Sequence, residues 1–325
     1  MQQATEMTAD PGRERALPAT PLTIAVVGAT ATGKTALAVG LARSIGAAEL
    51  VNADSRQVLR GLPIGTNTPG PADLDGVRCH LLAITDPGRL FSVADWLAAA
   101  RDCLADLDAR RVRPIIVGGT GLYVRALLDG LELDGAPPDP ARRAALNTRA
   151  ASPEGLAGLA GELTRRDPEG AAGIDLRNPR RVVRALEIVE ARGSLAGRHR
   201  GGAIRPSIRI GLDATPELHR GWIAERARAM MAGGLLDETA AALARGVPPK
   251  ALDGSGIGYR EALAVLDGTL SAAEAVDEIV RRTARYAKAQ RTWFRADRSV
   301  VWLPRERGDD LDELVTRAVA LAAGR

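Results

Sequence analysis

Cysteines, aromatic residues and long apolar runs are all scarce in this chain of 325 residues. The two cysteines, Cys79 and Cys103, are too few for a disulfide framework or a cysteine-based zinc site, so we expect a reducing, cytoplasmic environment. Aromatic residues make up only 3% of the chain, so the core must consist mainly of alanine, leucine, valine and isoleucine. No apolar run reaches the roughly 18 residues of a membrane span, so we expect no membrane association.

The chain also lacks several signals of targeting and assembly. The first 20 residues contain no apolar segment like that of a signal peptide, and we predict a disordered tail over residues 1–20. The histidines are too scattered to suggest a metal site, and nothing indicates more than a monomer. Lysine occurs only at Lys34, Lys250 and Lys288, in a chain whose other basic residues are arginines.

Short apolar segments alternate with segments of helical periodicity. We predict strands at residues 22–27, 49–53, 114–117, 208–212 and 300–303, and helices at residues 35–43, 92–110 and 122–128. Ser92 and Asp95 fit a capping box at the start of the second of these helices. The alternation predicts an α/β fold with a parallel sheet and helices on both faces. Because the loop after the first strand reads GATATGKT, a phosphate-binding pattern, we predict a core like that of the P-loop NTPases.

The composition changes after residue 131. The segment GAPPDP, residues 135–140, breaks regular structure, and the chain that follows is rich in alanine, glycine, arginine and glutamate without a clear strand. We therefore predict a helical insertion domain over residues 136–178, with residues 21–135 and 179–325 forming the core domain.

The segment GATATGKT, which begins at Gly28, is a phosphate-binding loop placed between a predicted strand and a predicted helix. The backbone N–H groups of such a loop surround phosphate oxygens, and the helix N-terminus adds positive potential. Lys34 can reach the outer oxygens, and the Thr35 hydroxyl can hold Mg²⁺. The pattern does not distinguish a nucleotide from another diphosphate.

Two further residues follow predicted strands and should lie at the same edge of the sheet. Asp54 is a candidate proton acceptor or magnesium partner, and Thr120, within GGTG, is a candidate for contacting an oxyanion. Ligands of parallel sheets bind beyond the carboxyl ends of the strands, so we expect both residues to converge on the phosphate loop.

Two arginine-rich segments favour a polyanionic partner. They are RNPRRVVRALEIVEARG, from Arg177, and RRTARYAKAQRTWFR, from Arg281; the second contains no acidic residue. An ordinary solvated helix face mixes charges of both signs. A folded RNA fits such segments, and the arginine lid of a small-molecule kinase is the alternative.

Seven segments together resemble one known family, the tRNA dimethylallyltransferases, also called tRNA isopentenylpyrophosphate transferases. In the family's order they are VVGATATGKTALA, VNADSRQVLRGLPIGTNTP, CHLLAITDPGRLFSVADW, PIIVGGTGLYVRALLDGL, NPRRVVRALEI, GSGIGYREAL and RYAKAQRTWFR. Ala29, Leu59 and Thr68 depart from the family's usual proline, tyrosine and lysine, and the spacing around Arg226 differs by one residue.

The resemblance implies transfer of a dimethylallyl group from dimethylallyl diphosphate to N6 of adenine 37, next to the tRNA anticodon, with Mg²⁺ as cofactor and pyrophosphate as product. Asp54 would act as the base and Thr120 would orient a substrate. Diphosphate binding is implied for Gly28, Ala29, Thr30, Ala31, Thr32, Gly33, Lys34, Thr35 and Arg226. Contact with the tRNA anticodon arm is implied for Asp54, Ser55, Arg56, Gln57, Thr120, Arg143, Arg180, Arg181, Val182, Val183, Arg184, Ser255, Gly256, Ile257, Gly258, Tyr259 and Arg260.

Three alternatives stay open from the residues. A small-molecule P-loop kinase would use the same loop for ATP. An adenylate isopentenyltransferase would prenylate a free nucleotide, and the arginine-rich segments argue against it. An RNA-binding regulator with an inactive loop is disfavoured by the intact Lys34, Thr35 and Asp54.

Overall fold

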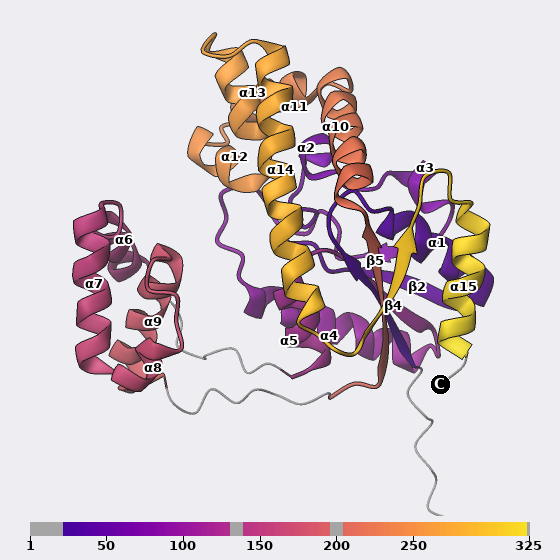
Figure 1. The fold of residues 1–325 in the computed structure, drawn as a ribbon, viewed down its shortest axis with the longest axis horizontal. Helices are drawn as coiled ribbons and strands as arrows, with labels where there is room; N and C mark the ends of the chain where they lie inside the picture. The colour runs from indigo at the N-terminus through magenta and orange to yellow at the C-terminus, as the bar shows by residue number, and fades with distance from the viewer. Residues whose placement is uncertain (1–21, 131–138, 196–203, 324–325) are drawn as a thin grey trace, which may run out of the picture.

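The computed structural model describes residues 22–130, 139–195 and 204–323 (Figure 1). The tail predicted over residues 1–20 lies outside the described residues. Within the described ranges, no helix is long and apolar enough to cross a membrane.

A six-stranded, entirely parallel sheet forms the centre of the molecule, in the order β3-β2-β4-β1-β5-β6. The strands are β1 (Thr23–Gly28), β2 (Ala48–Asn52), β3 (Cys79–His80), β4 (Arg113–Val117), β5 (Ser207–Ala214) and β6 (Val300–Arg305). All five predicted strands are present, because each is a short and mainly apolar segment, and the central strand β1 is buried along its whole length. The two-residue edge strand β3 is too short to carry a periodic signal and was not predicted.

Helices cover both faces of the sheet, so the predicted fold class is confirmed. On one face, α1 (Lys34–Ile45) and α15 (Leu311–Ala323) share a hydrophobic cluster with the strands. On the other face lie α4 (Val93–Ala109), α5 (Gly121–Leu128) and the end of α14 (Ala272–Arg295). The predicted capping box is also confirmed, since the Ser92 hydroxyl accepts a hydrogen bond from the Asp95 amide.

A group of helices stands beyond the carboxyl ends of the strands (Figure 1). It comprises α10 (Pro216–Ala232), α11 (Leu235–Ala244), α12 (Pro249–Ser255), α13 (Tyr259–Leu266) and the first part of α14. These helices share a hydrophobic cluster with α2 (Pro63–Thr66), which follows β2; the short α3 (Pro71–Leu74) lies near α1. The cluster places a helical wall opposite the edge of the sheet where the loops after β1, β2 and β4 meet.

Four helices form a separate lobe: α6 (Pro140–Arg149), α7 (Pro153–Arg166), α8 (Pro168–Ala172) and α9 (Pro179–Arg192). Their apolar side chains make one cluster, and most of α9's buried residues lie in it. The sequence placed a domain boundary at residue 178, before α9. The hydrophobic contacts instead place α9 with the insertion, because its buried apolar side chains pack in the cluster of that lobe.

Candidate active site

The phosphate loop lies between β1 and α1 and turns through three residues with positive φ: Gly28, Ala31 and Gly33. At Gly28, φ is 135° and an added Cβ would lie 2.6 Å from the Leu212 carbonyl oxygen, so both the backbone conformation and the space require glycine. Gly33, with φ of 86°, directly precedes α1. The loop therefore delivers the first amides of a twelve-residue helix to the cavity described below.

Lys34 folds back over this loop. Its Nζ donates a hydrogen bond to the Ala29 carbonyl oxygen at 2.6 Å. Burial lowers the pKa of Lys34 to about 8; the attraction of Asp54 opposes this shift and the positive charge of Arg226 adds to it. Burial thus disfavours the charged form of Lys34. An anion bound at the loop would stabilise that charge, so the site favours a negatively charged ligand.

Helices α10 and α14 hold the loop from outside the sheet. Gln290 of α14 accepts a hydrogen bond from the Thr30 amide at 2.8 Å and donates one to the Gly119 carbonyl at 2.9 Å, which joins the loops after β1 and β4. From α10, Arg226 donates to the Thr30 hydroxyl at 2.6 Å, and Nε2 of His219 lies 2.7 Å from the Thr30 carbonyl oxygen. The structure thus brings Arg226 to the loop, as the resemblance implied.

Asp54 follows β2 and lines the same cavity. Its backbone amide donates to the Asn52 side chain at 3.1 Å, and its carboxylate accepts from the Arg56 amide at 2.8 Å. Thr120 does not line the cavity: its hydroxyl accepts from the Ser55 amide at 2.9 Å and lies 3.3 Å from the Ser55 hydroxyl. We therefore assign Thr120 to holding the loop after β2, which differs from the substrate contact that the resemblance implied.

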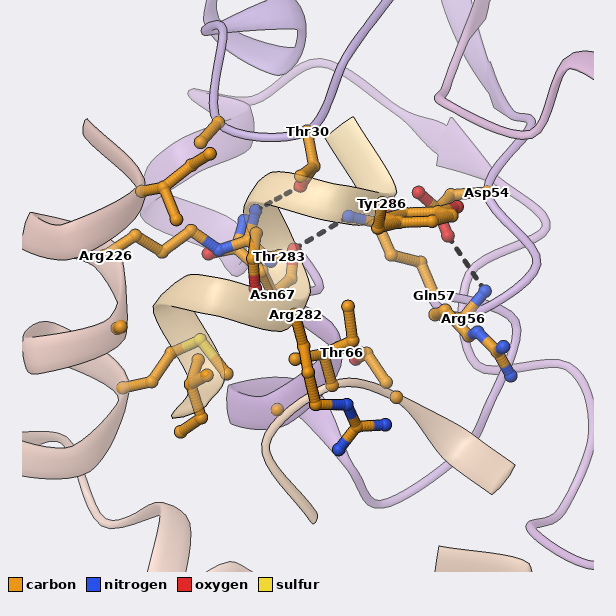
Figure 2. Close-up of a pocket in the computed structure, with 18 of the residues that line it drawn as sticks. Thr30, Asp54, Arg56, Gln57, Thr66, Asn67, Arg226, Arg282, Thr283 and Tyr286 are labelled. Atoms are coloured by element: carbon orange, nitrogen blue, oxygen red, sulfur yellow. Dashed lines mark hydrogen bonds between the residues drawn. The ribbon is translucent and has the colours of Figure 1, made fainter. Parts of the chain in front are cut away.

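The cavity has a volume of about 600 Å³ and lies between the phosphate loop, the loop after β2 and the helical wall (Figure 2). Arg226 lies on one side of it and Asp54 on the other, with Tyr286 extending toward Asp54. Burial and the negative charge of Asp54 raise the pKa of Tyr286 to about 12, so its hydroxyl stays protonated as a hydrogen-bond donor at neutral pH.

Sequence reasoning singled out the arginine-rich segment of α14, which includes Arg282, but gave no role in the site to Tyr286 or Gln290. Arg282, Tyr286 and Gln290 recur every four residues and therefore share one helix face. Arg282 and Tyr286 line the cavity, and Gln290 holds the loop. The available signal was the spacing of these three polar residues by four, which places them on one face of the helix.

The residues implied to contact tRNA fall into two groups. The structure places Arg56, Gln57, Arg180, Gly256, Ile257 and Arg260 at the cavity, and Arg181 is exposed on α9. Val182 and Val183 are buried in the insertion core, and Ser255, Gly258 and Tyr259 are buried in the helical wall. The side chains of Val182, Val183, Ser255 and Tyr259 pack inward, whereas the implied contact of this second group with tRNA stays a prediction.

Many of the arginines are neutralised by carboxylates that come from elsewhere in the fold. Arg143 donates two bonds of 2.6 Å to Glu187, and Arg184 donates to the same carboxylate at 3.1 Å. In α14, Arg282 pairs with Glu261, and Arg291 lies 2.9 Å from Asp213. A segment that contains only basic charges in the sequence can therefore still have its arginines paired with carboxylates from elsewhere in the fold.

A magnesium ion would have to rely on few protein ligands. No group of three or more histidine, cysteine, aspartate or glutamate side chains is placed to hold a metal within residues 22–130, 139–195 and 204–323. Thr35 and Asp54 both line the cavity. Mg²⁺ commonly keeps several waters and binds through one or two protein oxygens plus substrate phosphates, so these two residues fit that mode.

Comparison with known proteins gives two overlapping family matches. The sequence model of the family described as IPP transferase matches residues 57–297, and that described as isopentenyl transferase matches residues 22–86. Among curated relatives, the tRNA dimethylallyltransferase of Roseiflexus sp. is 41% identical over 289 residues, covering 88% of this chain and 94% of the relative. That of Streptomyces coelicolor is 42% identical over 289 residues, covering 88% and 91%.

Solved structures agree with these matches. The tRNA isopentenylpyrophosphate transferase of Bacillus halodurans is 36% identical, with a TM-score of 0.69, covering 93% of this chain and 96% of that one. A eukaryotic dimethylallyltransferase, solved acting on tRNA, has a TM-score of 0.75 at 20% identity, covering 94% and 80%, and is similar in fold.

Proposed function

The chain belongs to the IPP transferase family, and on this premise we propose that it transfers a dimethylallyl group from dimethylallyl diphosphate to N6 of adenine 37 in tRNA, releasing pyrophosphate. One observation carries the proposal: the phosphate loop with Lys34, Arg226 and the carboxylate of Asp54 line one cavity, and Arg226 and Asp54 lie on opposite sides of it. Such a cavity can hold a leaving diphosphate and an attacking base at once.

The phosphate loop would bind the diphosphate. Its amides, Lys34 and Arg226 face the space where negative charge grows as the carbon–oxygen bond breaks. Preformed donors of this kind stabilise a developing charge because they do not need to reorient during the reaction. Mg²⁺, when bound, would neutralise part of the charge on the diphosphate oxygens, and Thr35 is the residue that would hold it.

Asp54 would receive the proton that the adenine amino group loses on attack. Its carboxylate is held in place by the Arg56 amide and has no ion-pair partner among the described side chains, so it is free to accept a proton. The adenine must leave its stack to reach the cavity. Arg56, Arg180 and Arg260 at the cavity can contact the flanking phosphates.

The test is incubation with labelled dimethylallyl diphosphate, Mg²⁺ and unmodified tRNA, followed by digestion to nucleosides. We expect the label on N6 of the adenine next to the anticodon. Label on free AMP, ADP or ATP with none on tRNA would instead identify an adenylate isopentenyltransferase. Transfer of phosphate from radiolabelled ATP to a small acceptor would identify a kinase. Action as a monomer in the cytoplasm stays a prediction of the sequence.

A further inference from the structure

Apolar side chains form one wall of the cavity next to the phosphate loop. They are Ile223, Ala227 and Met230 on α10, and Ile279 on α14. With Arg226, the three residues of α10 follow the spacing i, i+3, i+4 and i+7, so they share one face of the helix. This face therefore presents a cation followed by apolar groups, which matches a ligand with an anionic head and a hydrocarbon tail.

The order of these residues along α10 gives the wall a direction. Ile223 packs with Ala29 and Ala31 of the phosphate loop, and Arg226 bonds to Thr30. Met230 belongs instead to the cluster of the helical wall. Met230 lies four positions after Arg226 along the helix, a rise of about 6 Å. That rise is comparable with the length of a single five-carbon prenyl unit.

The far end of the wall is closed. A Cβ added to Gly258 would lie 3.2 Å from Cε of Met230, 3.3 Å from Cδ2 of Leu235 and 3.9 Å from Cδ1 of Ile279. The Met230 and Ile279 side chains thus meet against the backbone at the start of α13. Met230 is only 6% exposed, so it has little room to swing away toward solvent.

We propose that Met230, backed by Ile279, determines substrate specificity by limiting the prenyl chain to five carbons. This inference rests on the proposed function and concerns the same cavity. With the diphosphate at the loop, a dimethylallyl group fits between Arg226 and Met230, whereas the second unit of a geranyl chain would meet Met230. Asp54 lies across the cavity from Arg226 (Figure 2), so the tail does not block the approach of the adenine.

Comparison of dimethylallyl and geranyl diphosphate as substrates tests the inference. Met230→Ala opens space for several carbon atoms, and we expect the ratio of kcat/KM for dimethylallyl over geranyl diphosphate to fall at least about tenfold. Met231→Ala is the matched control. Met231 packs against the same cluster but does not line the cavity, so its loss should leave the ratio unchanged.

A second variant changes the space in the opposite direction. Ala227→Leu should raise the KM for dimethylallyl diphosphate about tenfold while leaving the Kd for inorganic pyrophosphate unchanged, because only the tail is obstructed. If Met230→Ala does not fold, Ala227→Leu still tests the inference. An unchanged substrate ratio in folded Met230→Ala, or an equal loss of both affinities in Ala227→Leu, would overturn the inference. The wild-type protein is assayed for tRNA prenylation in parallel. If it prenylates tRNA and either of these results is obtained, the inference about Met230 fails while the proposed function stands.

Discussion

The insertion and the cavity use charged side chains in opposite ways. In the insertion, the carboxylates of Glu187 and Glu190 each accept hydrogen bonds from two arginines of the same lobe. In the cavity, Lys34, Arg226 and Asp54 have no ion-pair partner among the residues that the structure describes.

This difference separates charges that stabilise the fold from charges available to a ligand. A paired arginine has already exchanged its hydration for a carboxylate, whereas an unpaired and partly buried cation pays the desolvation cost without compensation. The pKa of Lys34, lowered to about 8 by burial, records that cost. Partly buried charged groups without an ion-pair partner are candidates for ligand binding, because a ligand of opposite charge can act as the partner.

The largest effect should come from removing the unpaired lysine. Lys34→Ala should lower kcat/KM for dimethylallyl diphosphate by about 10³-fold, because a charged donor to the leaving group is lost. Steady-state kinetics measure the loss. Lys288→Ala removes an exposed lysine of α14 that does not line the cavity, and it should behave as wild type. Equal losses in the two variants would contradict a special role for Lys34.

The unpaired carboxylate should come next. Asp54→Asn keeps an acceptor for the Arg56 amide but removes the base, so we expect kcat to fall about 10²-fold while tRNA affinity stays nearly unchanged. Single-turnover kinetics and a tRNA filter-binding assay separate the two quantities. A kcat near that of wild type would remove Asp54 from the mechanism.

Unpaired and paired arginines of the insertion should differ in tRNA binding. The double variant Arg180→Gln/Arg181→Gln should weaken binding about tenfold and flatten its dependence on salt, because contacts with phosphates are lost. Arg166→Gln is the control, since Arg166 is paired with Glu162 and Glu190. Binding isotherms at several salt concentrations measure the slope. The same slope in all three proteins would show that tRNA does not contact α9.

The pH dependence of pyrophosphate binding tests the state of Lys34. Below pH 8 its amine is charged in the free protein; between about pH 8 and its ordinary value of 10.5 it is neutral until an anion restores the charge. Pyrophosphate binding should then take up a proton, and affinity should fall by up to about tenfold per pH unit as pH rises above 8. Calorimetry in two buffers of different ionisation enthalpy measures the uptake. In Lys34→Arg, residue 34 is always charged, so the part of the proton uptake that is due to residue 34 should disappear.

Breaking a paired charge should affect stability more than activity. Burial would raise the pKa of Glu187, but hydrogen bonds from Arg143 and Arg184 hold it below its ordinary value. Its contribution to stability is therefore present above that ordinary value and is lost as the pH falls through the lowered pKa. Glu187→Gln should lower the free energy of unfolding of the insertion by about 1–3 kcal/mol at neutral pH. Hydrogen exchange of α6 and α9 measures this change, with kcat expected to stay close to wild type.

Much of the core and part of the site could be predicted from the chain. The predicted strands are short and mainly apolar segments of the chain, and the phosphate loop is a contiguous motif whose glycines meet local backbone requirements. Asp54 could be placed at the cavity because β2 ends immediately before the loop that carries it.

The remainder depended on contacts between distant segments. Gln290 reaches Thr30 across 260 residues, and Arg226 reaches it across 196. The buried positions of Val182 and Tyr259 follow from which helix faces pack together, and a motif read along the chain does not contain that information.

By itself, the sequence determined the parallel sheet and the phosphate loop, because both depend on residues adjacent in the chain. The tertiary structure alone decided which charges are neutralised, which arginines remain available and where the cavity ends at Met230. The physical reason is that a carboxylate or an apolar wall acts through space, and its partners are selected by the packing of helices that lie far apart in the sequence.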